Sequence, residues 1–186
     1  MVEFISFILS NFTLSFFVLG MIPIIFVVLK ESRLKPTYYS SERILAYFIF
    51  FNIGLNNLYN FVMHVFYGDM AAKFIGWEQS PFQLEVGFAS LGFAVVGLMC
   101  ISVKNLGFRT ATVLCPTFFL WGAAGGHIYQ MITKDNFSPG NAGIIFWTDI
   151  FLPIIGLVLL IIQWRCSKSI SPSLWAPQQF WENIGI

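Results

Sequence analysis

Four ionisable side chains lie within stretches of the sequence that are otherwise strongly apolar: His64, Glu85, His127 and Asp149. A charge inside a lipid bilayer is costly unless it is paired or hydrated, so each of these residues is a candidate functional group. Together, two imidazoles and two carboxylates can bind a divalent cation such as Zn²⁺, Fe²⁺ or Mn²⁺. They can equally hold and relay protons. The first hypothesis is therefore a site that binds a divalent metal ion or protons, with conduction of the bound ion as an extension of this hypothesis.

Two further interpretations use the same residues. His64 and His127 are the only histidines in the chain, and two imidazoles on different helices can be the axial ligands of a b-type haem. Alternatively, the acids and imidazoles only pair with one another and lock the helices of a non-catalytic accessory subunit. The spacing does not choose between these interpretations, because each residue lies on a different apolar segment and no HExxH or ExxH motif occurs.

A ladder of polar residues extends from one of the histidines. Its members are Asn52, Asn56, Asn57, Asn60 and His64. Steps of four residues place them on one face of a helix, where they form a stripe about 18 Å long, more than half of the hydrocarbon thickness. The stripe either joins helices by hydrogen bonds or forms a polar path toward the cluster. Asn57, Asn60 and Gln130 are expected to surround the site, and Asn52 and Asn56 to extend it.

An enzyme that uses a nucleophile is not expected. Ser90, about one turn from Glu85, is the only serine or cysteine that the apolar segments bring toward the ionisable cluster. The three cysteines, Cys100, Cys115 and Cys166, show no CxxC spacing and are expected to be reduced.

The composition indicates that these residues are held by helices in a membrane. Of 186 residues, 57% are hydrophobic and only 10% are charged, and the mean hydropathy is +0.75. Twenty-two Phe and six Trp suit a surface that faces lipid. The formal net charge of +1 provides no basic field, so nucleic acid is not an expected partner.

Five segments are long and apolar enough to cross a bilayer as helices. They are residues 4–29, 44–66, 81–103, 110–133 and 142–164. The first lacks the positive flank of a signal peptide and is expected to be retained. The sequence thus predicts an all-α integral membrane bundle of about five transmembrane helices, with residues 1–166 as a single transmembrane domain.

Turn residues predict where several of these helices begin and end. Ser80 is expected to cap the third segment, with Pro81 in its first turn and Gln83 completing a capping box. Asn141 is expected to cap the fifth segment, and residues 69–77 to form a short surface helix that ends at Gly76. In the fourth segment, Gly122 and Gly126 form a GxxxG pair, which indicates either close packing, including homodimerisation, or clearance for a flat cofactor.

Basic residues predict the orientation in the membrane. Lys73 and Lys134 lie on one side of the predicted bundle, and the other eight lie on the opposite side: Lys30, Arg33, Lys35, Arg43, Lys104, Arg109, Arg165 and Lys168. Because short cytoplasmic loops are enriched in Lys and Arg, we expect the N-terminus outside and the C-terminus in the cytoplasm. Residues 167–186 are then a cytoplasmic tail that lies at the membrane interface. The ionisable cluster falls in the outer leaflet.

Several stretches resemble a family of small prokaryotic multi-pass inner-membrane proteins known only as a domain of unknown function. They are Gly76-Trp77-Glu78, Ser80-Pro81-Phe82-Gln83, Glu85-Val86-Gly87, Gly126-His127-Ile128-Tyr129 and Asn141-Ala142-Gly143. The resemblance covers about the second half of the chain and implies a bundle in a prokaryotic inner membrane. It implies no activity, so the expected partners are the lipid bilayer and a second copy or another membrane subunit.

Overall fold

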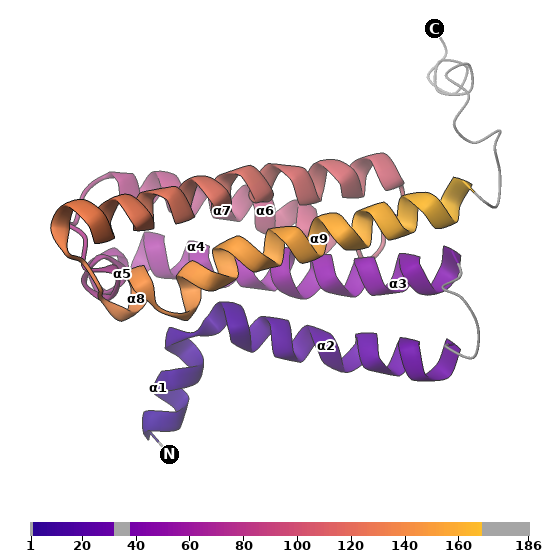
Figure 1. Ribbon diagram of the computed structural model, residues 1–186, viewed down its shortest axis with the longest axis horizontal. Helices are drawn as coiled ribbons and strands as arrows, with labels where there is room; N and C mark the ends of the chain where they lie inside the picture. The colour runs from indigo at the N-terminus through magenta and orange to yellow at the C-terminus, as the bar shows by residue number, and fades with distance from the viewer. Residues whose placement is uncertain (1, 32–37, 169–186) are drawn as a thin grey trace, which may run out of the picture.

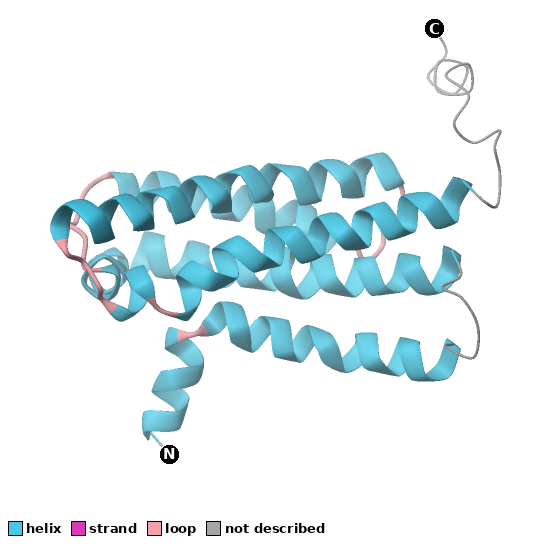
Figure 2. Cartoon of the chain, viewed as in Figure 1, coloured by secondary structure: helices cyan, strands magenta, loops and turns pink. Residues whose placement is uncertain are grey.

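Every regular element in the computed structural model is a helix, as Figures 1 and 2 show for residues 2–31 and 38–168, which the structure describes. The predicted all-α class is therefore confirmed for this part of the chain. The helices are α1 (Val2–Ser10), α2 (Phe12–Glu31), α3 (Tyr38–Ile49), α4 (Asn56–Phe66), α5 (Gly68–Ile75), α6 (Phe82–Met99), α7 (Leu106–Lys134), α8 (Pro139–Ala142) and α9 (Ile144–Lys168), with the π-helix η1 (Phe50–Leu55) between α3 and α4. Of the expected tail, only Ser167 and Lys168 are described, at the end of α9.

The long helices run side by side along the longest axis of the molecule (Figure 1). These are α2, the continuous helix formed by α3, η1 and α4, and the helices α6, α7 and α9. The short helices α5 and α8 close one end of the bundle, and α1 turns away from it at the same end (Figure 1). This end, which we call the cavity end, also holds the end of α7 and the start of α9.

The first predicted segment, residues 4–29, consists of two helices rather than one. The break falls at Asn11, whose side-chain amide donates to the carbonyl of Phe7 at 2.9 Å. The Ser15 hydroxyl donates to the carbonyl of Ile8 at 3.0 Å. Asn and Ser side chains compete with helical hydrogen bonds in this way, so an apolar run does not guarantee an uninterrupted helix.

The second long helix begins at Tyr38, six residues before the predicted start, and contains the π-helix η1. Within η1, Gly54 lies against Gly97 of α6, and a Cβ atom built on Gly97 would lie 2.5 Å from the Gly54 nitrogen. Two glycines thus allow the backbones of η1 and α6 to meet. A π-helical turn inside an α-helix frequently marks a functional site.

Two of the predicted caps are wrong. Pro81 occupies the N-cap position of α6 without a side-chain bond, and the Gln83 side chain turns to His64 instead. Asn141 lies inside α8 and is fully buried, because three polar neighbours engage its side chain. The short surface helix is confirmed as α5, and Gly76 ends it in the left-handed conformation with φ 76°.

The distribution of side chains is compatible with a membrane protein. Three helices of the described chain are long and apolar enough to cross a membrane: Phe12–Lys30, Phe82–Met99 and Pro139–Lys168. Large apolar side chains cover the outside, where Phe26 is 69% and Ile132 76% exposed, whereas polar residues such as Asn56 and Gln163 are buried inside. Such a surface suits lipid as the solvent.

The end of the bundle opposite the cavity end is tightly packed. Its apolar core consists of Ile24, Leu45, Phe48, Ile49, Ile53, Cys100, Val113, Leu152 and Leu160. Beside it, the fully buried guanidinium of Arg109 lies 2.7 Å from the Glu42 carboxylate and donates to the carbonyls of Glu42, Cys100 and Val103. This ion pair ties the start of α3 to the start of α7. Cys100 and Cys115 are free thiols, as predicted.

Candidate functional site

His127 is held in the cavity end by a buried asparagine and a tryptophan. Its Nδ1 lies 2.8 Å from Asn141 Oδ1, and the same oxygen accepts a hydrogen bond of 2.9 Å from the indole nitrogen of Trp77. The Asn141 amide nitrogen donates to the carbonyls of His127 and Asn136. The side chain of one residue on α8 thus links α7 to the segment that follows α5.

These partners determine which nitrogen of His127 carries a proton. Both contacts of Asn141 Nδ2 are carbonyls, and indole N–H only donates, so the orientation of the Asn141 amide is unambiguous. Asn141 Oδ1 is therefore an acceptor, and His127 Nδ1 must donate to it. The other nitrogen, Nε2, is left to interact with Asp149, whose Oδ2 lies 3.7 Å away.

His127 and Asp149 lie next to each other in a buried position. The side chains of both residues are more than nine-tenths buried, and an uncompensated charge at such a position is costly. Two arrangements would leave the pair neutral: imidazole with carboxylic acid, and imidazolium with carboxylate. The structure thus brings together two of the four predicted site residues.

His64 is oriented from a different helix. Its Nδ1 lies 2.5 Å from Oε1 of the buried Gln83 on α6. One turn earlier on α4, the Asn60 amide donates at 2.9 Å to the hydroxyl of Ser90, which itself donates to the carbonyl of Val86. Polar side chains on two successive turns of α4 thus form hydrogen bonds with α6.

Both histidines and Asp149 line one cavity with a volume of about 1030 Å³. The polar side chains in its wall are Ser6, Ser10, Thr13, Asn56, Asn57, Tyr59, Asn60, His64, Tyr67, Trp77, Gln83, His127 and Asp149. Gly122 and Gly126 also line it, and a Cβ atom built on Gly122 would meet nothing within 4 Å. A Cβ atom built on Gly126 would instead lie 3.5 Å from the Trp77 ring, so only Gly122 of the GxxxG pair faces open space within the chain.

Two predicted residues lie apart from this site. Glu85 is exposed and does not line the cavity, because its position on α6 points away from the face that carries Gln83 and Val86. Gln130 is partly buried and does not line it either. Without Glu85, no group of three or more His, Cys, Asp or Glu side chains in residues 2–31 and 38–168 could hold a metal ion. The Nε2 atom that a haem iron would need on His127 is turned to Asp149.

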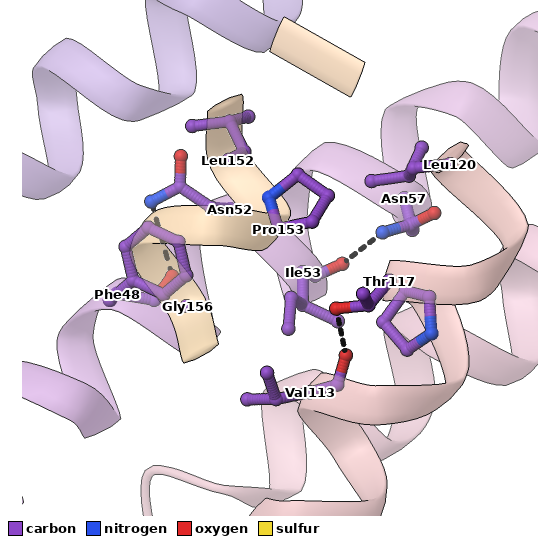
Figure 3. Close-up of a pocket in the computed structure, with 11 residues that line it drawn as sticks. Phe48, Asn52, Ile53, Asn57, Val113, Thr117, Leu120, Leu152, Pro153 and Gly156 are labelled. Carbon is purple, nitrogen blue, oxygen red and sulfur yellow. Dashed lines mark hydrogen bonds between the residues drawn. The ribbon is translucent and has the colours of Figure 1, made fainter. Parts of the chain in front are cut away.

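The asparagine ladder leads from the large cavity to a much smaller one. Asn57 lines both, and Asn52 lines the smaller, whose volume of about 20 Å³ has room for one water molecule. Figure 3 shows Asn52 and Asn57 turning their amide nitrogens to the carbonyls of Phe48 and Ile53. The Oδ1 atoms of Asn52 and Asn56 are buried without a hydrogen-bond partner.

The small cavity is the innermost point of this polar tract. Phe48, Ile53, Val113 and Leu152 form part of its wall and belong to the apolar core. Polar groups thus extend from the cavity end to the middle of the bundle, where they meet the apolar core. The tract resembles a blind pocket more than a channel.

Sequence reasoning missed three residues that shape the site. Asn141 and Gln83 were assigned to helix caps, and Trp77 to a surface helix, because each lies at a turn where local signals dominate. Their hydrogen bonds join residues 14, 19 and 64 positions apart, and no local pattern encodes such pairs.

Comparison with known proteins gives a family but no activity. No curated protein and no solved structure matches the chain. A family described only as one of unknown function, DUF6790, matches residues 10–169. The match spans most of the sequence, including every residue of the polar cluster, and the chain therefore belongs to this family of unknown function.

Proposed function

We propose that this protein is a five-span membrane protein whose cavity binds a small, largely apolar molecule and directs the polar groups of that molecule toward His64, His127 and Asp149. The cavity of about 1030 Å³ onto which these three residues open carries the proposal. Its volume matches the upper range of small-molecule sites, which measure roughly 300–1,000 Å³. A mainly apolar wall with a few convergent polar groups is typical of such sites.

Length and position support five membrane-crossing helices. The helix α7 has 29 residues, which span about 43 Å and exceed the hydrocarbon thickness of about 30 Å. Both α7 and the continuous helix from α3 to α4 are more polar than the other three long helices because they carry the asparagines and histidines of the cavity wall. We place the cavity end outside a prokaryotic inner membrane, since the opposite end carries most of the basic residues.

Binding is better supported than conduction or metal coordination. The apolar core beyond Asn52 interrupts the polar tract, and Glu85 does not reach the cluster. A non-catalytic accessory subunit is the alternative. In that case the polar residues would only hold helices together, and a space as large as this cavity would have no role.

Photolabelling tests the proposal. The protein in lipid nanodiscs is irradiated with benzophenone, a neutral aromatic ketone, and labelling of Met63, which lines the cavity, is compared with that of Met99, which is 47% exposed. We expect Gly122→Leu to lower the Met63 to Met99 ratio, because the new side chain occupies the cavity.

The matched control is Gly125→Leu on the same helix. A Cβ atom at either glycine meets nothing within 4 Å, but Gly125 does not line the cavity. The control should keep the ratio of the unaltered protein. Equal ratios in all three proteins would show that benzophenone reaches Met63 only through the lipid, and the proposal would fail.

A further inference from the structure

The cavity wall has an unbalanced distribution of charged groups. Among the residues that the structure describes, Asp149 is the only acidic side chain in the wall, and none of the lining residues is Lys or Arg. The titratable side chains that share the cavity with Asp149 are His127 on α7 and His64, Tyr59 and Tyr67 from the segment of α4. The lining residues of α1, α2, α5, α6 and α8 include none. A ligand in this cavity therefore meets one carboxyl group and no fixed positive charge.

Aromatic rings line the same cavity as that carboxyl group. The aromatic residues that line the cavity, apart from its histidines, are Phe12, Tyr59, Tyr67, Phe74, Trp77, Phe82, Phe118 and Phe119. The faces of such rings attract cations. Asn56 also lines the cavity, and its side chain carries no positive charge that would oppose a cation.

We propose that the ligand of the cavity is a lipophilic organic cation, such as an amine or quaternary ammonium ion with apolar substituents, and that it binds in exchange for the proton of the His127–Asp149 pair. The inference rests on the proposed function, because it names the class of molecule that the cavity binds. Apolar substituents fit the aromatic and aliphatic wall, and the positive centre lies near Asp149.

The exchange conserves charge. The empty site holds one proton on His127 Nε2 or on Asp149 and is neutral. Binding of the cation leaves a neutral imidazole and a carboxylate, and the proton passes to solvent at the cavity end. The occupied site is again neutral, so the buried carboxylate is never left without a compensating charge.

Two probes of the same shape and opposite charge test the inference. Binding of tetraphenylphosphonium and of tetraphenylborate is measured on the protein in zwitterionic nanodiscs, and binding to the Gly122→Leu variant is subtracted as partition into lipid. We expect the cation to bind at least about tenfold more tightly than the anion. Its Kd should fall about tenfold per pH unit while one proton is released per cation bound.

The Asp149→Asn variant removes the exchangeable charge with little change in shape. Its tetraphenylphosphonium affinity should fall at least about tenfold, and its Kd should no longer depend on pH, whereas Gly125→Leu should bind the cation as the unaltered protein does. Since Asp149→Asn also alters a buried group, the comparison of the two probes on the unaltered protein decides the matter if the variant does not fold.

The outcomes separate this inference from the proposed function. Four results would each overturn the proposal that the ligand is an organic cation. They are equal affinities for both probes, tighter binding of the anion, absence of binding, and a Kd for the cation that is independent of pH. If benzophenone still labels Met63 in a manner that depends on Gly122, the cavity binds neutral molecules and the proposed function stands. If that labelling also fails, both proposals fall.

Discussion

Asn141 is the residue on which most of the polar cluster depends. Its side chain accepts hydrogen bonds from Trp77 and His127 and donates to two carbonyls, and it is fully buried. It sets the proton of His127 on Nδ1 and so turns Nε2 toward Asp149. The chemistry assigned to the histidine is therefore determined by an amide on a different helix.

Replacing Asn141 by Ala should destabilise the protein more than replacing Asn60, which makes one hydrogen bond to a side chain. At about 0.6 kcal/mol for each bond, the loss should be about 2 kcal/mol for Asn141→Ala and about 0.6 kcal/mol for Asn60→Ala. Thermal unfolding in detergent, followed by tryptophan fluorescence, measures both. Equal losses of stability in the two variants would show that the hydrogen bonds of Asn141 do not add up to a larger contribution than the single bond of Asn60.

At the level of the helices, irregular segments meet around the small cavity. The π-helix η1 contributes Asn52 and Ile53 to its wall, and α9 contributes Pro153 (Figure 3). Pro116 of α7 also lines it. Each proline lacks the N–H that would bind the carbonyl one turn earlier. Three long helices are therefore irregular at one depth, between the ligand cavity and the apolar core.

The contact between η1 and α6 provides a test of packing at this depth. Gly97→Ala should cost about 1–3 kcal/mol, because the added methyl group would overlap the backbone at Gly54. Gly92→Ala on the same helix is the control, since a Cβ atom there meets nothing within 4 Å. Unfolding temperatures of the two variants give the comparison, and a loss in Gly92→Ala of the same size would refute the argument.

The sequence predicted the helices better than the site. Apolar length sufficed to locate α6, α7 and α9, since this signal is local, whereas the caps predicted for α6 and α9 are wrong. Apolar length did not predict the break at Asn11, which depends on side chains that compete for backbone carbonyls. Glu85 is expected at the cluster because the bounds of the predicted segment give its depth along the helix. They do not give the direction in which its side chain points around the helix axis. This direction depends on packing between helices, which one sequence does not reveal.

In the whole molecule, most of the basic residues lie at the end opposite the cavity. Lys30, Arg43, Lys104, Arg109, Arg165 and Lys168 belong to the end where α2 and α9 finish and α3 and α7 begin, whereas Lys73 and Lys134 belong to the cavity end (Figure 1). In the proposed orientation, the cavity end faces outward.

Cysteine reporters test this orientation. In a variant without native cysteines, Gln79→Cys should react with an impermeant maleimide in intact spheroplasts, because it lies at the proposed outer end. Lys104→Cys should react only after permeabilisation, since it lies at the proposed cytoplasmic end. The reverse pattern would contradict the orientation and place the cavity in the inner leaflet, and labelling of both sites in intact spheroplasts would indicate a leaky preparation.

The ion pair between Glu42 and Arg109 has a consequence for how the protein is made. The two residues are 67 positions apart, an interval that a ribosome needs roughly 3–13 seconds to translate. During that time α3 carries its acid without the guanidinium that later covers it, so its end of the bundle remains hydrated. Synthesis of α7 then closes this end. A nascent chain that stops before Arg109 would leave the Glu42 carboxylate without the buried guanidinium that it contacts in the finished protein.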